Sequence, residues 1–389
     1  MGGTPLSMKQ FAQSHADHAL SRLASHPVGI EAPSIARCGA IHLEHACCLL
    51  VSDIVRRAIG ILGSQPDFRV FIHDDGAELK KALHETRLRY LAAANGGELS
   101  KSNDLPSMAA NRIWRSHGRR FLSKTSHQDW VPVFEQELCS RWIDMVDRVF
   151  KALGVVVSTW NTDAEILNET QLFEVFEERL IYQEMLRVDA SGAAEVRTSH
   201  GSFPWRSSTD EPSTFARDVV YQALKLSKPG IEWKNFWSGA TSPYIRGVVE
   251  VLGVFTPSAS RLKWPLEHDV TNPSSGGPAL GLAESFDLGG LLESEGRSVT
   301  RLALLRVASG HSLTGSLTWA HEQVASLRSA RRGASETDAP DAQDLCRTFL
   351  SSPAPLAWCL DVLDCASLSA SFLTNASFIE DVLGVVIER

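Results

Sequence analysis

The chain has 389 residues and a mass of 42.6 kDa, with 43% hydrophobic and 22% charged residues, as is typical of a soluble globular protein with two or three structural units. Its 38 basic and 46 acidic side chains give a formal net charge of -8, which excludes a uniformly basic nucleic-acid-binding protein. The sequence has no apolar run of about 18 residues and only 7 scattered cysteines, so we expect no membrane partner, no disulfide framework and a reducing, cytoplasmic location.

Helical periodicity dominates the first half of the chain. The run from Pro33 to Gly63 is mostly apolar and predicts a central buried helix, whereas the short aromatic and branched run 68–72 predicts a strand. Three further helices and a second strand are expected over 77–95, 106–124, 129–153 and 155–158.

The second half begins with an acidic segment, 163–188, which we expect to be helical, and with a polar loop over 191–214. Helices are expected again over 213–226, 243–254 and 312–332. The fold class that follows is mainly α, with two helical lobes, minor short β-strands and helical terminal arms. The predicted domains are an N-terminal helical arm 1–26, a first lobe with a basic face 27–158, a second lobe 159–332 with an irregular loop 257–290, a linker 333–341 and a C-terminal helical segment 342–389.

Basic residues are concentrated in one part of the first lobe. Between positions 79 and 124 ten basic residues face three acidic ones, a local charge of +7, whereas the remainder of the chain carries -15. On a helix over 106–124, Arg112, Arg115 and Arg119 fall on one side, within an arc of about 60 degrees. The predicted nucleic-acid-binding residues are Lys80, Lys81, Arg87, Arg89, Arg112, Arg115, Arg119, Arg120 and Lys124.

Stacked guanidinium groups repel one another, so an anion or a carboxylate is expected beside them. A phosphate backbone suits guanidinium geometry, because each fork can donate two hydrogen bonds to one phosphate. The alternatives are ion pairs with the acidic segment 163–188, or a solvated face. Trp205, in the predicted loop, is the tryptophan that we would test for stacking on a base or packing on a neighbour.

Several short motifs suggest catalysis or metal binding. Asp74-Asp75-Gly76-Ala77-Glu78 resembles the aspartate-rich metal motif of class I terpene cyclases, but Asn111 stands where the second motif of that family has its last acidic ligand. Asp74 and Asp75 are better interpreted as caps of the following helix.

Arg37 and His42 have the Arg-x4-His spacing of HEPN-type ribonucleases, and Glu232-Trp233-Lys234 after Asp218 resembles the metal motif of PD-(D/E)xK nucleases. The first motif lies in the run assigned to a core helix, and the second is flanked by turn residues. His42 and His45 have no third and fourth zinc ligand at a known spacing. We therefore predict no catalytic residue, no metal and no cofactor.

The size, the helical content, the basic face and the terminal arms resemble the architecture of nucleoproteins of negative-strand RNA viruses and of helical capsid proteins. This resemblance implies a non-enzymatic structural protein that binds an RNA backbone independently of sequence and self-assembles as a homo-oligomer through its terminal segments. Two alternatives stay open: a helical, metal-dependent or HEPN-like enzyme acting on a phosphate-bearing substrate, and a regulatory or effector protein that binds another protein.

Overall fold

The computed structural model of the chain is mainly α with a few short strands, as predicted. It describes residues 27–39, 41–73, 77–94, 104–122, 127–162, 170–227, 231–235, 243–255, 287–333, 342–352, 355–366 and 378–386. The predicted N-terminal arm, Asp74 and Asp75, nearly all of the irregular loop and nearly all of the linker lie outside these ranges. Within them, no helix is both long and apolar enough to cross a membrane.

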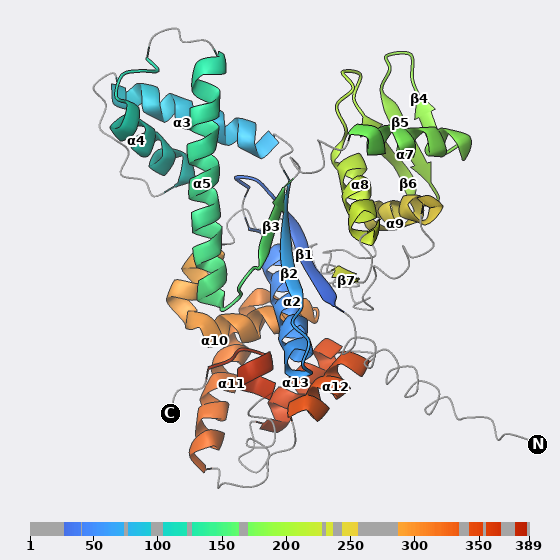
Figure 1. Cartoon of the computed structure of the whole chain (residues 1–389). Coiled ribbons are helices and arrows are strands. Elements are labelled where there is room, and N and C mark those ends of the chain that lie inside the picture. The colour runs from blue at the N-terminus through green and yellow to red at the C-terminus, as the bar shows by residue number, and fades with distance from the viewer. Residues whose placement is uncertain are drawn as a thin grey trace, which may run out of the picture.

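A four-stranded parallel sheet lies at the centre of the molecule (Figure 1). Its order is β3-β2-β1-β7, so the chain builds outward from β1 through β2 to β3 and later returns to the other side of β1. This order is the one found in doubly wound, nucleotide-binding sheets. The strands are β1 (Val28–Ala36), β2 (Asp67–His73), β3 (Thr159–Thr162) and β7 (Glu232–Asn235).

Helices cover both faces of this sheet because successive strand residues point to opposite sides. Alternate residues of β1 and β2, such as Ile30 and Val70, share the largest hydrophobic core with α2 (Leu43–Ile61). The intervening residues face α8 (Thr214–Ser227), where the rings of Phe71 and Tyr221 stack at a centroid distance of 4.0 Å. Behind α2 lie α10 (Leu288–Ala308) and α12 (Ala342–Ser351).

An all-helical insertion separates β2 from β3 and projects from the sheet (Figure 1). It consists of α3 (Ala77–Ala94), α4 (Leu105–His117) and α5 (His127–Leu153). Tyr90, Ile113, Phe121 and Phe134 form a separate aromatic core inside it. The 27 residues of α5 extend for about 40 Å, so one helix spans from this core to the side of α10.

A second, smaller unit holds α7 (Thr170–Tyr182), β4 (Leu186–Val188), β5 (Ala194–Thr198), β6 (Gly201–Arg206) and α9 (Pro243–Phe255). Its three strands form an antiparallel sheet with its own core. The predicted acidic helix therefore ends at Tyr182, and the predicted loop 191–214 was wrong over its first half. Ala194, Val196 and Trp205 are buried in the core between exposed or half-buried neighbours, and this alternation is typical of strands.

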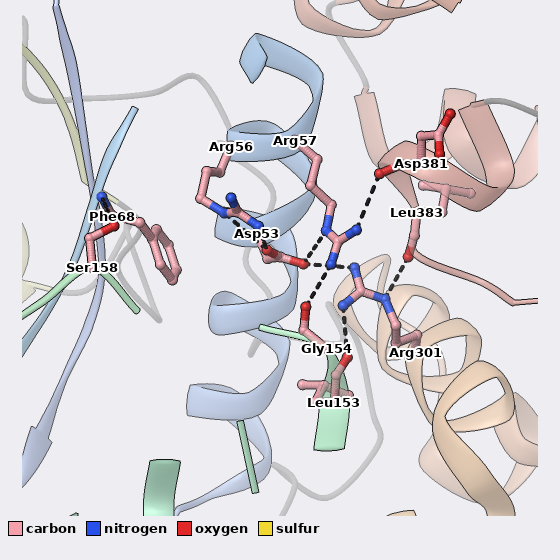
Figure 2. Close-up of polar contacts among 10 residues, drawn as sticks. All are labelled: Asp53, Arg56, Arg57, Phe68, Leu153, Gly154, Ser158, Arg301, Asp381 and Leu383. Carbon is pink, nitrogen blue, oxygen red and sulfur yellow. Dashed lines mark hydrogen bonds and ion pairs between the residues drawn. The ribbon is translucent and has the colours of Figure 1, made fainter. Parts of the chain in front are cut away.

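The carboxyl-terminal elements pack around α2 and α10 and consist of α11 (Leu313–Gly333), α13 (Pro355–Ala366) and the π-helical turn η2 (Phe378–Val382). A buried ion cluster joins them to the sheet unit (Figure 2). Asp53 of α2, with no exposed side-chain surface, accepts hydrogen bonds from Arg56, Arg57 and Arg301. Burial alone raises the pKa of Asp53, but the attraction to Arg301, Arg57 and Arg56 outweighs it and lowers that pKa.

The Arg301 guanidinium connects three segments at once. Besides Asp53, it donates to the carbonyl oxygens of Leu153, at the end of α5, and Leu383, after η2, at 2.9 and 2.5 Å. Arg57 donates to the carbonyl oxygen of Gly154 at 2.6 Å. Elements far apart in the chain are thus fixed to α2 by one charged cluster.

Three sequence expectations were wrong near the sheet. Residues 33–36 belong to β1 rather than to a buried helix, because a turn with Cys38 at φ 62° separates the strand from α2. The second strand begins at Thr159, not at Val155. The segment around Trp233, expected to be a turn, is strand β7, whose Trp233 ring lies over Gly29 of β1. The four-stranded sheet therefore takes strands from both predicted lobes.

Candidate functional site at the carboxyl edge of the parallel sheet

The strand order indicates where a ligand would bind. In open α/β sheets, ligands bind outside the carboxyl ends of the strands at the point where the strand order reverses. Here that point lies between β1 and β7. The carboxyl ends of β1 and β2 lie side by side, since Ala36 pairs with His73 and the Arg37 N–H donates to the His73 carbonyl oxygen at 2.8 Å.

A stripe of polar side chains on α8 faces this part of the sheet. Asp218, Tyr221, Gln222 and Lys225 follow the helical spacing i, i+3, i+4 and i+7, so they lie on one side of the helix. Each of them contacts a polar side chain of the sheet or of its immediate surroundings. Buried polar groups of this kind gather at functional sites, although structural ion pairs also produce them.

Three residues of the stripe, Tyr221, Gln222 and Lys225, form a closed network around Glu31 of β1. Lys225 Nζ lies 2.9 Å from one carboxylate oxygen of Glu31, and Gln222 donates to the same oxygen at 3.2 Å. Tyr221 donates to the other oxygen at 2.5 Å and accepts from Asn161 at 2.8 Å. Burial lowers the pKa of Lys225 and, with the adjacent Glu31 charge, raises the pKa of Tyr221. Both oxygens of Glu31 thus have partners within the chain.

The fourth residue of the stripe, Asp218, is more exposed to solvent. The Asp218 carboxylate lies 3.3 Å from His73 Nε2 and accepts a hydrogen bond from the Tyr244 hydroxyl at 2.6 Å. Its side chain is 18% exposed, against 4% for Glu31. Asp218 is therefore a carboxylate that a cationic ligand can reach from solvent, and the buried His73 ring fixes one side of it.

The start of α2 completes this edge. The His42 backbone N–H donates to His45 Nδ1 at 3.3 Å, so that nitrogen is an acceptor and His45 is a neutral ring protonated at Nε2. Burial, together with the neighbouring His42, lowers the pKa of His45 to about 4. Among the described residues no three His, Cys, Asp or Glu side chains come together in a way that would hold a metal ion.

The predicted basic residues separate into two groups in the structure. Six are exposed on α3, on α4 and just after α4, and within the described ranges no ion pair involves the three arginines predicted to form the central face. The acidic helix does not neutralise them there: its Glu177 pairs with Arg206 at 2.9 Å. The exposed residues are Lys80, Lys81, Arg112, Arg115, Arg119 and Arg120. The helix expected over 106–124 ends at His117, where Gly118 has a φ of 52°, so Arg119 lies in the turn after α4 and not on one helical face with Arg112 and Arg115.

The other predicted contacts have different surroundings. Arg89 makes ion pairs with Glu85 and Asp104, and Arg87 lies 4.9 Å from the centroid of the Trp130 ring. Both therefore stabilise the insertion. Lys124 lies outside the described residues.

The other candidate residues from the sequence do not converge on one site. Trp205 is 1% exposed in the core of the second unit, so its ring has no free face for a base. Arg37 lies 3.9 Å from Glu135, and His42 is an exposed residue at the start of α2. Our sequence reasoning missed the polar stripe of α8. The signal was present, because the helical pattern of Asp218, Tyr221, Gln222 and Lys225 interrupts an otherwise apolar segment.

A doubly wound strand order with a polar stripe at its carboxyl edge defines a class of ligand-binding α/β proteins and enzymes. No family model matches the chain. The Arginine--tRNA ligase of Wolbachia sp. subsp. Brugia malayi (strain TRS) is 20% identical in a match of 304 residues, which covers 72% of this chain and 53% of that protein. The chain thus spans about half the length of this relative.

Several solved structures with a similar fold are of arginyl-tRNA synthetases or of a putative one. A putative arginyl-tRNA synthetase from Campylobacter jejuni has a TM-score of 0.59 and 13% identity, over 97% of this chain and 90% of that one. The arginyl-tRNA synthetase of Thermus thermophilus has a TM-score of 0.50 and 13% identity, over 95% and 77% of the two chains. That of Plasmodium falciparum has a TM-score of 0.50 and 10% identity, over 92% and 69%.

These findings correct the functional interpretation of the sequence. The chain is similar to arginyl-tRNA synthetases, which are enzymes, so the prediction of a viral structural protein of the nucleoprotein or capsid kind was wrong. Size, helical content and a basic face misled us because they do not distinguish a structural protein from an enzyme. Nothing found in the comparisons supports the predicted sequence independence of RNA binding or the predicted homo-oligomer formed through the terminal segments.

Proposed function

We propose that the chain is an enzyme of the arginyl-tRNA synthetase type, which takes an amino acid at the carboxyl edge of the parallel sheet and an RNA on the basic face of the helical insertion. One observation carries the proposal. A sequence match over 304 residues and a structural match over 97% of the chain point independently to the same enzyme.

The geometry of the carboxyl edge supports a cationic amino acid as ligand. A guanidinium group is recognised best by a carboxylate that can accept two parallel hydrogen bonds. Glu31 is closed by Lys225, Tyr221 and Gln222, whereas Asp218 keeps contact with solvent. We therefore assign the recognition of the ligand side chain to Asp218, held in position by His73 and Tyr244.

The exposed arginines of α4 and of the turn after it support RNA as the second ligand. Arg112, Arg115 and Arg119 are exposed, and within the described ranges none of them has an ion-pair partner in the chain. Exposed guanidinium groups bind phosphates and release the counterions condensed on them. RNA binding of this kind places the substrate without reading its bases.

The amino-acid half of the proposal is tested by arginine binding and by ligation. Joining an amino acid to RNA in water is uphill, so the assay contains the full chain, arginine, total tRNA and ATP, in keeping with the nucleotide-binding strand order. Asp218→Asn should weaken arginine binding by about 10- to 100-fold, because a charged hydrogen-bond partner is lost.

The matched control is Asp361→Asn, at an exposed position of α13, which should leave arginine affinity unchanged. A wild-type protein that neither binds arginine in calorimetry nor attaches it to tRNA would refute the enzymatic proposal. Equal affinity of the wild type and Asp218→Asn would refute only the role of Asp218.

The RNA half is tested by reversing the charge of three exposed arginines on α4 and in the turn after it. The triple variant Arg112→Glu, Arg115→Glu, Arg119→Glu should bind tRNA far more weakly, and the slope of log K against log salt should fall by about 2 to 3 units. The control makes the same charge change at three exposed arginines elsewhere, with Arg187→Glu, Arg246→Glu and Arg332→Glu. Equal losses in the two triple variants would show that only net charge matters.

A further inference from the structure

The turn between β1 and α2 is held against one face of the long helix α5. Arg37 Nη1 lies 3.9 Å from Glu135 Oε1, and the Trp142 indole N–H donates to the Gly39 carbonyl oxygen at 3.0 Å. Positions 135, 139 and 142 follow helical spacing, so they share one side of α5. Cys38 stands between Arg37 and Gly39, and Cys139 lies on α5 between their partners Glu135 and Trp142, so the two cysteines are held opposite each other.

The backbone fixes Cys38 in this position. Its φ of 62° lies in the left-handed region, which residues with a Cβ rarely adopt outside special turns. Such outliers persist where the surrounding structure enforces them, and they gather at functional sites. Here the contacts on both sides, at Arg37 and Gly39, enforce a conformation that directs the thiol toward α5.

The two thiols are chemically unequal. The hydrogen bond from Cys38 lowers the pKa of Cys139 despite its burial, and the Arg37 guanidinium lowers it further. Cys38 keeps its proton, because donating to Cys139 and burial both raise its pKa. Both side chains retain some exposure, whereas the other described cysteines, Cys47, Cys48, Cys346 and Cys359, are buried.

We propose that Cys38 and Cys139 are a thiol–disulfide modification site, whose reversible disulfide fastens the turn between β1 and α2 to α5. A lowered pKa next to a second thiol is the arrangement of reactive cysteine pairs. In a reducing location such a pair is reduced by default and is oxidised only transiently. The disulfide would enclose residues 38–139 in a covalent loop, which includes the start of α2 and His73 at the carboxyl end of β2.

A low-molecular-weight disulfide such as glutathione disulfide is the oxidant, and the protein disulfide forms in two exchange steps. The Cys139 thiolate attacks one sulfur of glutathione disulfide, which forms a mixed disulfide and expels one glutathione thiolate. Cys38 then loses its proton and attacks the Cys139 sulfur, which forms the protein disulfide and expels the second glutathione. Two protein thiols are oxidised and one glutathione disulfide is reduced to two glutathione molecules.

The test uses the folded full-length chain in glutathione buffers of increasing oxidation, with free thiols trapped at each point. Trypsin together with a glutamate-specific protease separates Cys38 from Cys47 and Cys48, because Glu44 lies between them. The expected product is a 38–139 cross-linked peptide pair with no bound glutathione, reversed by dithiothreitol, while Cys47 and Cys48 stay thiols. Free thiols at both positions across the series, separate glutathione adducts on both, or cross-links to other cysteines would overturn the proposal.

Single variants test the order of the two steps. Cys38→Ser should trap glutathione on Cys139, because the attacking thiolate is kept and the resolving thiol is gone. Cys139→Ser should leave Cys38 modified about 10-fold more slowly than Cys139 is in Cys38→Ser, since burial still raises the pKa of the Cys38 thiol when its partner is gone. A faster reaction at Cys38 would reverse the assigned roles. Circular dichroism spectra matching the wild type would show that both variants are folded.

Discussion

The Asp53 cluster offers the most direct test of how the carboxyl-terminal elements are held to the sheet. In Asp53→Asn the side chain keeps its shape but loses its charge. Arg56 and Arg57 are 26% and 19% exposed and can gain water in place of the carboxylate. Arg301 is only 1% exposed and keeps just its carbonyl partners, so it carries most of the cost.

Breaking a buried ion pair by removing one partner costs about 3–5 kcal/mol. We therefore expect Asp53→Asn to lower the free energy of unfolding by about that amount. Urea unfolding followed by circular dichroism measures it. The control is Asp344→Asn, which removes a carboxylate that is 70% exposed and paired with Arg347, and should change stability by less than about 0.5 kcal/mol.

The acid dependence gives an independent test of the same cluster. Because the pKa of Asp53 is lower in the folded chain than in the unfolded chain, its stabilisation is complete above the unfolded value and is lost as the pH falls through the folded one. The difference between the wild type and Asp53→Asn should thus be full at pH 7 and shrink below about pH 4. A loss under 1 kcal/mol at pH 7, or a difference that does not change with acid, would refute the assignment of the cluster as a stabilising hub.

Three further predictions concern the sheet and its edge. Gly29→Ala should lower the melting temperature, because the added methyl group would lie 2.4 Å from ring atoms of Trp233; an unchanged melting temperature would mean that the ring moves without cost. Lys225→Met should destabilise the chain by about 3–5 kcal/mol in urea unfolding, and adding Glu31→Gln should recover most of it, since no unpaired buried charge is left. Because the pKa of His45 is lowered to about 4 in the folded chain, the unfolded chain binds more protons between about pH 4 and 6.5, and the free energy of unfolding should fall as the pH drops through that window. His45→Gln should make the free energy of unfolding depend less on pH there. Parallel pH profiles of the wild type and the variant would contradict this.

The candidate site was only partly accessible from the sequence. Arg112 and Arg115 could be placed on one face because helical spacing is local, and the structure keeps both exposed on α4, whereas Arg119 was expected on the same helix and lies beyond its end at His117. Glu31 could not be paired with Tyr221 in this way, since the two residues are 190 positions apart. The same limit applies to Cys38 and Cys139, which only the packing of the β1–α2 turn against α5 brings together.

The sequence by itself determined the mainly α character of this protein and the approximate ranges of its amphipathic helices, such as α5, expected over 129–153 and found at His127–Leu153. It did so because one buried face of a helix repeats every three to four residues and needs no distant partner to be recognised. The tertiary structure alone decided the parallel sheet. The short strand β7 becomes a strand only by hydrogen bonding to β1, and β1 itself contains Pro33 and the charged Glu31. Parallel strands are paired through contacts far apart in the chain, and those contacts create the carboxyl edge at which we place the function.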